Sequence, residues 1–291
     1  MKIGYPCINT SIGCTANSTF RLKSYSEKRL ISAVQNNLDC LLKILEYNVN
    51  HGLLFFRIGS DLVPFASHPI CRFGWEKYFK KQFKHIGSFI KKHKIRISMH
   101  PDQFTLINSP SRQITKRSIK ELEYHRRILD AMCLGTEAKI QIHVGGVYGN
   151  KARAIESFVK RYKSLDRKIK NRLVIENDDI SYSLKDCLKI NQRTKIPVVL
   201  DAYHHQILNN GESIRDALIK AKKTWKKKDG LLMVDYSSGR RGKRTHAEHI
   251  NINDFKKFIE KTKGLNFDMM LEIKDKEKSA LKAAALLKNE K

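Results

Sequence analysis

The stretch that decides the fold is Ile95-Arg96-Ile97-Ser98-Met99-His100-Pro101-Asp102-Gln103-Phe104. Its β-prone first half ends at His100, because Pro101 cannot donate a ladder hydrogen bond and stops a central strand. Comparable apolar runs end on a histidine or carboxylate at His143, Glu176, Asp201 and Glu272. A single histidine at a strand end is more often structural than functional. The repetition of metal-ligand residues at strand ends instead predicts one site on which the strands converge.

Short apolar runs alternate with helical patterns along the whole chain. Strands are expected near residues 2–8, 52–59, 95–100, 138–144, 172–177, 196–201, 230–236 and 267–273. Helices are expected near residues 26–45, 74–93, 112–134, 150–169, 183–192, 211–224, 252–263 and 275–290. This alternation predicts a (β/α)₈ TIM barrel, a single domain over residues 1–291, with its active site at the C-terminal strand ends. A doubly wound open sheet is the competing topology, but no glycine-rich dinucleotide loop supports it.

The charge is the strongest compositional signal: 57 Lys and Arg face 29 Asp and Glu, a net charge of +28. Such an excess attracts a polyanion through counterion release, although helices decorated with solvated lysine would give the same total. The chain lacks an apolar run of transmembrane length, and residues 1–6 read as a strand rather than a signal peptide. We therefore expect an intracellular, soluble protein that works as a monomer and needs neither a membrane nor a protein partner.

Six cysteines are scattered along the chain without a CxxC pair. This spacing favours reduced, mostly buried thiols over a disulfide scaffold or a zinc–thiolate cluster. Two tracts are strongly basic, residues 222–228 and residues 240–244. The first should lie at the bottom of the barrel as a solvated surface. The second follows the seventh strand on the catalytic face, where phosphate contacts are expected from Arg240, Arg241 and Lys243.

The candidate metal ligands form a nitrogen and oxygen set without sulfur: His68, His100, His143, Glu176, Asp201, His204, His246 and Glu272. Imidazole and carboxylate together suit Zn, Mn or Fe, and carboxylate-rich portions favour Mn or Mg. The set is too large for one ion, so two or three ions sharing carboxylates are expected. Such clusters polarise a phosphate and convert bound water to hydroxide, which with the basic surface predicts phosphodiester hydrolysis in a nucleic acid. Asn177, His205 and His249 adjoin these residues and are candidates to orient them, Asn177 by contacting Glu176.

A resemblance becomes specific at this point. The motifs that carry it are Gly4-Tyr5-Pro6-Cys7-Ile8-Asn9, His100-Pro101-Asp102-Gln103-Phe104, His143-Val144-Gly145-Gly146, Glu176-Asn177-Asp178, Asp201-x-x-His204, His246-Ala247-Glu248 and Glu272-x-Lys274-Asp275-Lys276. Over nearly its whole length the chain resembles the UV damage endonuclease family. The resemblance implies a metal-dependent (β/α)₈ barrel related to apurinic endonucleases of the endonuclease IV type. It also implies nicking of double-stranded DNA immediately 5′ to pyrimidine dimers and 6-4 photoproducts, leaving a 3′-hydroxyl and a 5′-phosphate.

The resemblance also assigns roles. It implies that the eight candidate ligands bind two or three divalent ions, with Mn²⁺ foremost and Mg²⁺, Co²⁺ or Zn²⁺ as alternatives. Tyr5 and Asn9 match residues near the scissile phosphate, and we expect them to act with Glu176 in catalysis. Gln103 and Phe104 match a polar–aromatic pair that enters the duplex at the lesion, where a planar side chain fills the gap left by flipped bases.

The sequence departs from the family pattern after the seventh strand. Met233 and Asp235 stand where the family usually has lysine and a ligating histidine, and Glu248 replaces the usual Asp after His-Ala. Asp235 can still ligate a divalent ion and joins the candidate set. These departures bear on metal number, preferred ion and rate more than on the fold.

Three other functions fit parts of this pattern. An abasic-site or broader damage endonuclease would use the same barrel and metals. A sugar isomerase or epimerase would use a similar barrel, but the net charge and the Gln103-Phe104 loop argue against it. A DNA-binding barrel with a decayed site would explain Met233 and Asp235, but not the intact ligands elsewhere.

Overall fold

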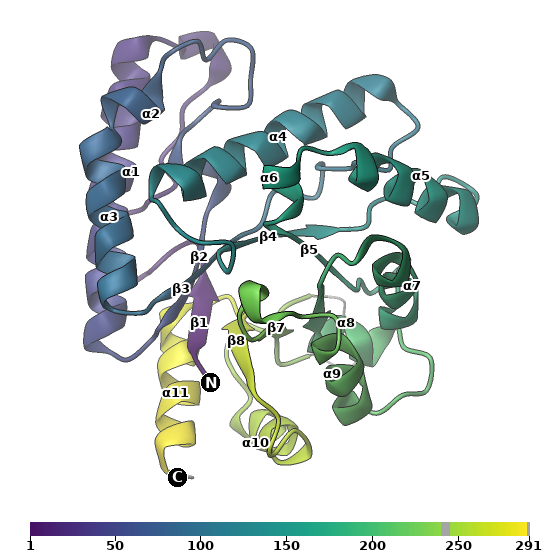
Figure 1. The fold of residues 1–291 in the computed structure, drawn as a ribbon. Helices are drawn as coiled ribbons and strands as arrows, with labels where there is room; N and C mark the ends of the chain where they lie inside the picture. Colours follow the sequence, from purple (N-terminus) through teal and green to yellow (C-terminus); the bar gives the residue numbers. More distant parts are fainter. Residues whose placement is uncertain (240–244, 290–291) are drawn as a thin grey trace.

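The computed structural model describes residues 1–239 and 245–289, and its strands form a closed parallel barrel (Figure 1). The strands are β1 (Ile3–Pro6), β2 (Phe55–Ile58), β3 (Arg96–Met99), β4 (Lys139–His143), β5 (Leu173–Glu176), β6 (Val198–Asp201), β7 (Leu232–Tyr236) and β8 (Phe267–Leu271). Each strand pairs with the next, and β8 closes the barrel by pairing Met270 with Gly4 of β1. The predicted (β/α)₈ barrel is confirmed.

The helices surround the barrel (Figure 1). They are α1 (Glu27–Asn50), α2 (Trp75–Tyr78), α3 (Lys80–Lys92), α4 (Arg112–Ala131), α5 (Lys151–Ser164), α6 (Arg167–Lys170), α7 (Leu184–Thr194), α8 (Ala202–Ile207), α9 (Ile214–Lys222), α10 (Ile252–Lys261) and α11 (Glu277–Asn289). Among the described residues, no helix is long and apolar enough to cross a membrane. The expected first helix begins as predicted, because the Ser26 side chain caps it by accepting from the Arg29 amide at 3.2 Å.

Three helical segments differ from the sequence prediction. The expected helix 150–169 is divided into α5 and α6, since Leu165 and Asp166 have extended, non-helical backbone angles. The expected helix 74–93 is divided at Phe79 into α2 and α3. The short helix α8 was not predicted, because its six residues are too few to show a helical period. Asp201 begins α8 by accepting from the His204 amide at 2.7 Å, so this capping bond also sets the spacing of two candidate ligands.

The barrel interior holds both charged and apolar side chains. Arg96 pairs with Asp268 at 2.8 Å and Lys139 pairs with Asp229 at 2.5 Å, and all four are buried. Phe55, Val174, Val199, Met233 and Met270 form a small buried cluster of their own. Met233, where the resemblance leads us to expect lysine, is part of this apolar cluster. Strand register then places polar residues side by side: His143 pairs with Glu176 across β4 and β5, and Asp201 pairs with Asp235 across β6 and β7.

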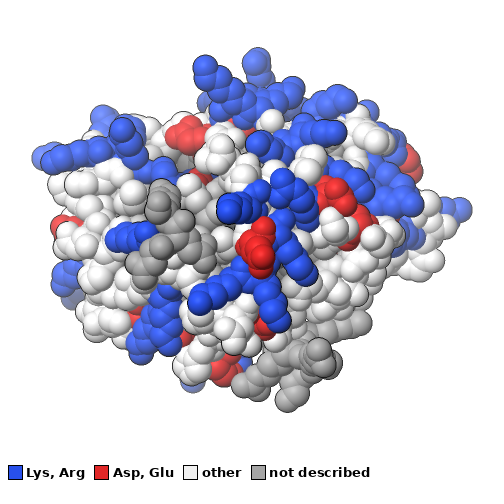
Figure 2. All heavy atoms as spheres, turned by 90° about the horizontal axis from the view of Figure 1, so that it is seen from below, with Lys and Arg blue, Asp and Glu red and all other residues white. Residues whose placement is uncertain are grey.

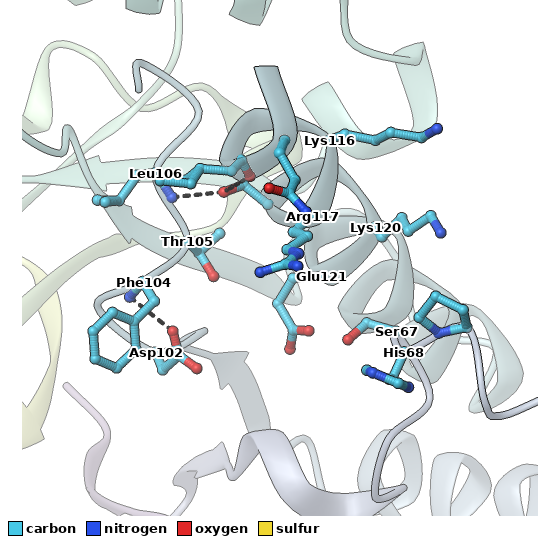
Figure 3. Close-up of a pocket in the computed structure, with 14 residues that line it drawn as sticks. Ser67, His68, Asp102, Phe104, Thr105, Leu106, Lys116, Arg117, Lys120 and Glu121 are labelled. Carbon is cyan, nitrogen blue, oxygen red and sulfur yellow. Dashed lines mark hydrogen bonds between the residues drawn. The ribbon is translucent and has the colours of Figure 1, made fainter. Parts of the chain in front are cut away.

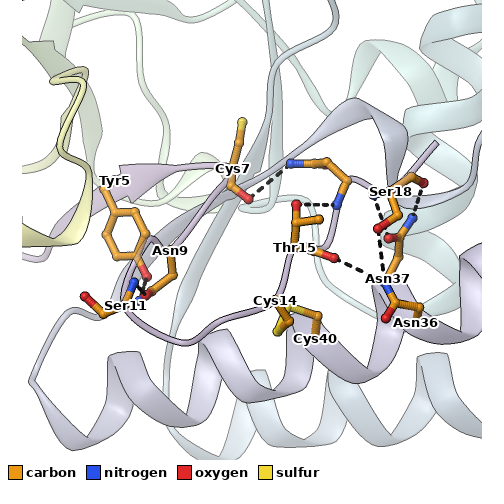
Figure 4. The surroundings of a disulfide bond; sticks show 11 residues. Tyr5, Cys7, Asn9, Ser11, Cys14, Thr15, Ser18, Asn36, Asn37 and Cys40 are labelled. Atoms are coloured by element: carbon orange, nitrogen blue, oxygen red, sulfur yellow. Dashed lines mark hydrogen bonds between the residues drawn. A yellow bond between two sulfur atoms is a disulfide. The ribbon is translucent and has the colours of Figure 1, made fainter.

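The prediction of six reduced, mostly buried thiols is wrong. Cys14 and Cys40 form a disulfide with a Cα–Cα distance of 5.9 Å, which ties the loop after β1 to α1 (Figure 4). The two cysteines are separated by 26 positions and share no motif, so only the packing of the loop on α1 brings them together. Of the four free cysteines, only Cys187 is buried, while Cys133 is exposed.

Candidate metal centre

Two groups of potential ligands meet at the C-terminal ends of the strands. His100, His143 and Glu176 form one group, and Glu176, Asp201 and Asp235 form the other. Within each group, one ligand atom per residue lies within 4.8 Å of the others. Glu176 belongs to both groups. A buried carboxylate shared between two groups is the arrangement by which one side chain can contact two divalent ions.

The first group centres on Glu176, whose side chain is buried. Its Oε1 lies 2.8 Å from His100 Nε2 and 2.9 Å from His143 Nε2. Burial alone would lower the pKa of His143, but the carboxylate of Glu176 raises it to about 9. In the metal-free protein the His143 imidazole is therefore protonated and positively charged at neutral pH. Binding of a divalent ion would have to displace that proton, which makes metal affinity depend on pH.

The second group carries an excess of buried carboxylates. Two histidines lie beside the carboxylates of this region. His204 Nδ1 is 3.3 Å from Asp201 Oδ2, and His246 Nε2 is 3.5 Å from Oε2 of Glu272, which is itself outside the group. Burial raises the pKa of Asp201 to about 7, and the charges of Glu272 and Glu176 contribute to the rise although His204 opposes it. Carboxylates that resist ionisation in this way would be stabilised by an added cation. The donor set thus fits a divalent metal.

Arg57 on β2 is a part of the centre that was not anticipated from the sequence. Its Nη2 donates to both carboxylate oxygens of Asp235, at 2.8 and 2.9 Å, and to Gln141 Oε1 at 3.1 Å. Its Nη1 donates to Glu272. Burial acts to lower the pKa of Arg57, but the carboxylates of Asp235 and Glu272 raise it above its ordinary value. The sequence did contain a signal for this role. Arg57 is a charged residue inside an apolar strand, and such a residue needs a buried partner of opposite charge.

Residues adjoining the ligands do not all orient them as expected. In the part of the chain that the structure describes, the Asn177 side chain forms no hydrogen bond with the Glu176 carboxylate. Its Nδ2 donates to the Asp201 carbonyl at 3.0 Å, and its Oδ1 accepts from the Asp201 amide at 3.0 Å. Asn177 therefore positions the end of β6. Gln141, rather than Asn177, orients the Glu176 carboxylate. Its Nε2 donates to both Glu176 and Asp235.

Tyr5, in β1, and Asn9, in the loop after it, are both buried and lie close together (Figure 4). The Tyr5 hydroxyl donates to Asn48 Oδ1 at 2.7 Å and accepts from Asn9 Nδ2 at 2.8 Å. Burial raises the pKa of the Tyr5 hydroxyl well above its ordinary value, so it stays protonated. The Tyr5 hydroxyl thus links Asn9 to α1, and the expected contact of both side chains with a phosphate stays a prediction.

His68 joins neither ligand group within the described residues. It is exposed, its Nδ1 accepts from the Ile70 amide at 3.1 Å, and it lies across a groove from Phe104 (Figure 3). Gln103 is exposed, and Phe104 is 72% exposed. Arg240, Arg241 and Lys243 lie outside the described residues.

The fold and the centre define the chain's class as a (β/α)₈ barrel with a His–carboxylate centre at the C-terminal strand ends. The family described as UV-endonuclease UvdE matches residues 1–290. The chain belongs to this family, as the motifs predicted, and the expectation of an endonuclease is confirmed.

Individual relatives agree with this assignment. A UV DNA damage endonuclease from Clostridium perfringens is 42% identical over 99% of this chain and 71% of its own length. The crystal structure of SacUVDE is 45% identical, with a TM-score of 0.95 and coverage of 99% of this chain and 98% of that chain. Endonuclease IV from Thermus thermophilus is 13% identical with a TM-score of 0.56, over 85% of this chain and 92% of that chain. At that identity, the likeness shows the shared barrel fold alone.

Proposed function

We propose that this chain nicks double-stranded DNA immediately 5′ to UV photoproducts and leaves a 3′-hydroxyl and a 5′-phosphate. The observation that carries the metal part of this proposal is the position of Glu176, which is shared by both ligand groups. The relatives named for UV DNA damage supply the substrate class. The enzyme would act as an intracellular monomer wherever genomic DNA is held.

His100, His143, Glu176, Asp201, His204, His246 and Glu272 would hold the ions. Asp235 and His68 complete the expected ligand set, Asp235 from the second group and His68 only if its loop approaches the centre. Bound divalent ions would polarise the scissile phosphate and supply hydroxide near neutral pH. Two or three ions are expected, and Mn²⁺ suits mixed imidazole and carboxylate donors, with Mg²⁺, Co²⁺ and Zn²⁺ as alternatives.

The chain's own residues arrange the centre for this work. Gln141 and Arg57 hold Glu176, Asp235 and Glu272 through hydrogen bonds, which fixes the carboxylates before substrate arrives. Tyr5 and Asn9 would approach the scissile phosphate once DNA is bound.

The surface suits a polyanionic substrate. Lys and Arg side chains are spread over the described surface in the view of Figure 2. The exposed Phe104 and Gln103 would enter the duplex at the lesion, where a photoproduct has already weakened stacking. Arg240, Arg241 and Lys243 are proposed to contact phosphates.

The test is a nicking assay with UV-irradiated, abasic and undamaged plasmids, each with Mn²⁺ and with excess chelator. We expect nicking of irradiated plasmid that depends on metal. An end-labelled duplex with one photoproduct should give a single product ending 5′ to the lesion with a ligatable 3′-hydroxyl. Equal nicking of irradiated and undamaged plasmid would refute the proposal, and preferential nicking of abasic plasmid would favour an endonuclease IV-type activity instead.

A further inference from the structure

The loop after β1, residues 7–21, carries Asn9 and is tied to α11 through one buried carboxylate, that of Glu277. The Thr10 amide donates to Glu277 Oε2 at 3.0 Å. The hydroxyls of Thr10 and Ser11 donate to Oε1 of the same carboxylate, at 2.6 and 2.7 Å. We propose that Glu277 is a positioning residue, which holds Asn9 where it can contact the scissile phosphate. The inference rests on the proposed function, because the role of Asn9 is part of that function.

Asn9 and Glu277 are connected through Ser11. The Ser11 hydroxyl binds Glu277, and the Ser11 amide donates to Asn9 Oδ1 at 2.9 Å. Asn9 Nδ2 donates to the Tyr5 hydroxyl at 2.8 Å, so both polar atoms of the Asn9 side chain are held. Thr10 and Ser11 are exposed, whereas Asn9 and Glu277 are buried. Apolar packing therefore does little to fix Thr10 and Ser11, and the hydrogen bonds to Glu277 supply the constraint.

The carboxylate of Glu277 is suited to three donors. Burial alone would raise the pKa of Glu277, but the hydrogen bonds from Thr10 and Ser11 hold it below its ordinary value. The group is therefore ionised at neutral pH, and it lies in the first turn of α11, where the helix dipole favours a negative charge. Hydrogen bonds to a charged acceptor are roughly twice as strong as those between neutral groups. A glutamine side chain would offer one acceptor oxygen in place of two, and its amide group would face one of the donors.

The connection between β8 and α11 also contacts the segment that carries His246, but not through Glu277. The main chain of residues 274–275 donates to the carbonyls of Ala247 and Glu248, at 3.0 and 3.2 Å. These bonds join main-chain groups and do not depend on the charge of Glu277. A variant at Glu277 should therefore disturb the loop after β1 and leave the candidate ligand His246 and the metal content unchanged.

The Cys14–Cys40 bond is a second anchor of the same loop, and it provides a control for stability. Figure 4 shows Asn9 and Ser11 together, away from the disulfide, which joins the loop to α1. Loss of the disulfide should lower stability without releasing the segment next to Asn9. Loss of the Glu277 carboxylate should release that segment. The two variants therefore separate the positioning of Asn9 from the general stability of the fold.

The test follows nicking of an end-labelled duplex with one photoproduct, in the presence of Mn²⁺, by full-length wild type, E277Q and C14S/C40S. We expect E277Q to lower kcat by at least ~10-fold, because a misplacement of about 1 Å can cost ~100-fold in rate. The KM and the metal content of E277Q should stay close to wild type. C14S/C40S should keep the wild-type kcat although it unfolds at lower denaturant. The variant T10V/S11A removes two of the three donors at exposed positions and should also lower kcat, so it carries the test if E277Q does not fold.

A second readout needs no substrate. Hydrogen–deuterium exchange is measured in EDTA on peptides that cover residues 8–13, where the amides of Thr10 and Ser11 should exchange at least ~10-fold faster in E277Q than in wild type. Unchanged exchange of these amides, an unchanged kcat in E277Q, or an equal loss of kcat in E277Q and C14S/C40S would overturn the assignment. If wild-type protein fails to nick irradiated DNA while E277Q still exchanges faster, the proposed function fails and the anchoring of Asn9 by Glu277 stands.

Discussion

Arg57 and Asp235 form a buried ion pair inside the barrel, in which Nη2 of Arg57 donates to both carboxylate oxygens of Asp235, at 2.8 and 2.9 Å. Asp235 belongs to the second group of potential metal ligands, so this chain places an internal cation against one of its candidate ligands. A divalent ion bound to Asp235 would lie close to the guanidinium and be repelled by it. Arg57 therefore positions the Asp235 carboxylate without binding the metal itself. We expect its loss to lower the stability of the fold first.

We expect Arg57→Met to lower the free energy of unfolding by about 3–5 kcal/mol, because it leaves the Asp235 carboxylate buried without its partner. Urea unfolding in EDTA measures this without a contribution from metal. The double variant Arg57→Met/Asp235→Asn should recover part of the loss. The single variant Asp235→Asn completes the comparison. If the losses of unfolding free energy in Arg57→Met and Asp235→Asn add up to the loss in the double variant, the two side chains do not interact.

Glu176→Gln should lower both bound metal and turnover, the latter by orders of magnitude, because one buried carboxylate serves both ligand groups. Metal content after dialysis, measured by elemental analysis, is the primary readout. Glu156→Gln on α5 is the matched control, since Glu156 pairs with Arg193 at the surface. Wild-type metal content in Glu176→Gln would remove this residue from the ligand set.

Phe104→Ala should lose discrimination between irradiated and undamaged duplex, while Phe104→Tyr should stay close to wild type. Stacking of one base on an aromatic ring contributes about 1–3 kcal/mol, or roughly 5- to 150-fold in binding. The measurement is the affinity for both duplexes in a Glu176→Gln background without added metal. An unchanged affinity ratio in Phe104→Ala would mean that another loop reads the lesion.

Removing the disulfide should destabilise the protein. Cys14 and Cys40 are separated by 26 positions, and closing a loop of that length stabilises by about 3–4 kcal/mol in the chain-entropy model. Cys14→Ser/Cys40→Ser should therefore unfold at lower denaturant than the oxidised wild type. Dithiothreitol should bring the wild type to the variant's midpoint and leave the variant unchanged. If dithiothreitol also moves the unfolding midpoint of the variant, the effect comes from the other cysteines and not from the Cys14–Cys40 bond.

His125 should make stability depend on pH. Burial lowers the pKa of His125 to about 4, and its Nδ1 contacts the Glu121 carbonyl oxygen at 2.8 Å. The unfolded pKa is about 6.5, so between these values the unfolded state binds more protons. The stabilisation is complete above a pH of about 6.5 and is lost as the pH falls toward about 4. The wild type should lose about 3 kcal/mol more than His125→Gln over this interval, as measured by urea unfolding. If the unfolding free energies of the wild type and His125→Gln change in parallel with pH, the prediction for His125 is wrong.

The sequence by itself determined the barrel and the edge at which its site lies. Alternating strand and helix periods specify a (β/α)₈ barrel, and parallel strands bring their C-terminal ends to one face. His100, His143, Glu176 and Asp201 could be placed together for that reason, since each ends or directly follows a strand. These predictions depend on local periodicity, which a sequence records directly.

Only the tertiary structure decided which side chains pair inside that edge. Arg57 and Asp235 are 178 positions apart, and their contact follows from where each strand's inward side falls in the closed barrel. The Cys14–Cys40 bond, the contact of Asn177 with Asp201, and the separation of His68 from the ligand groups have the same origin. Each depends on a distance across the fold, and no local spacing encodes that distance.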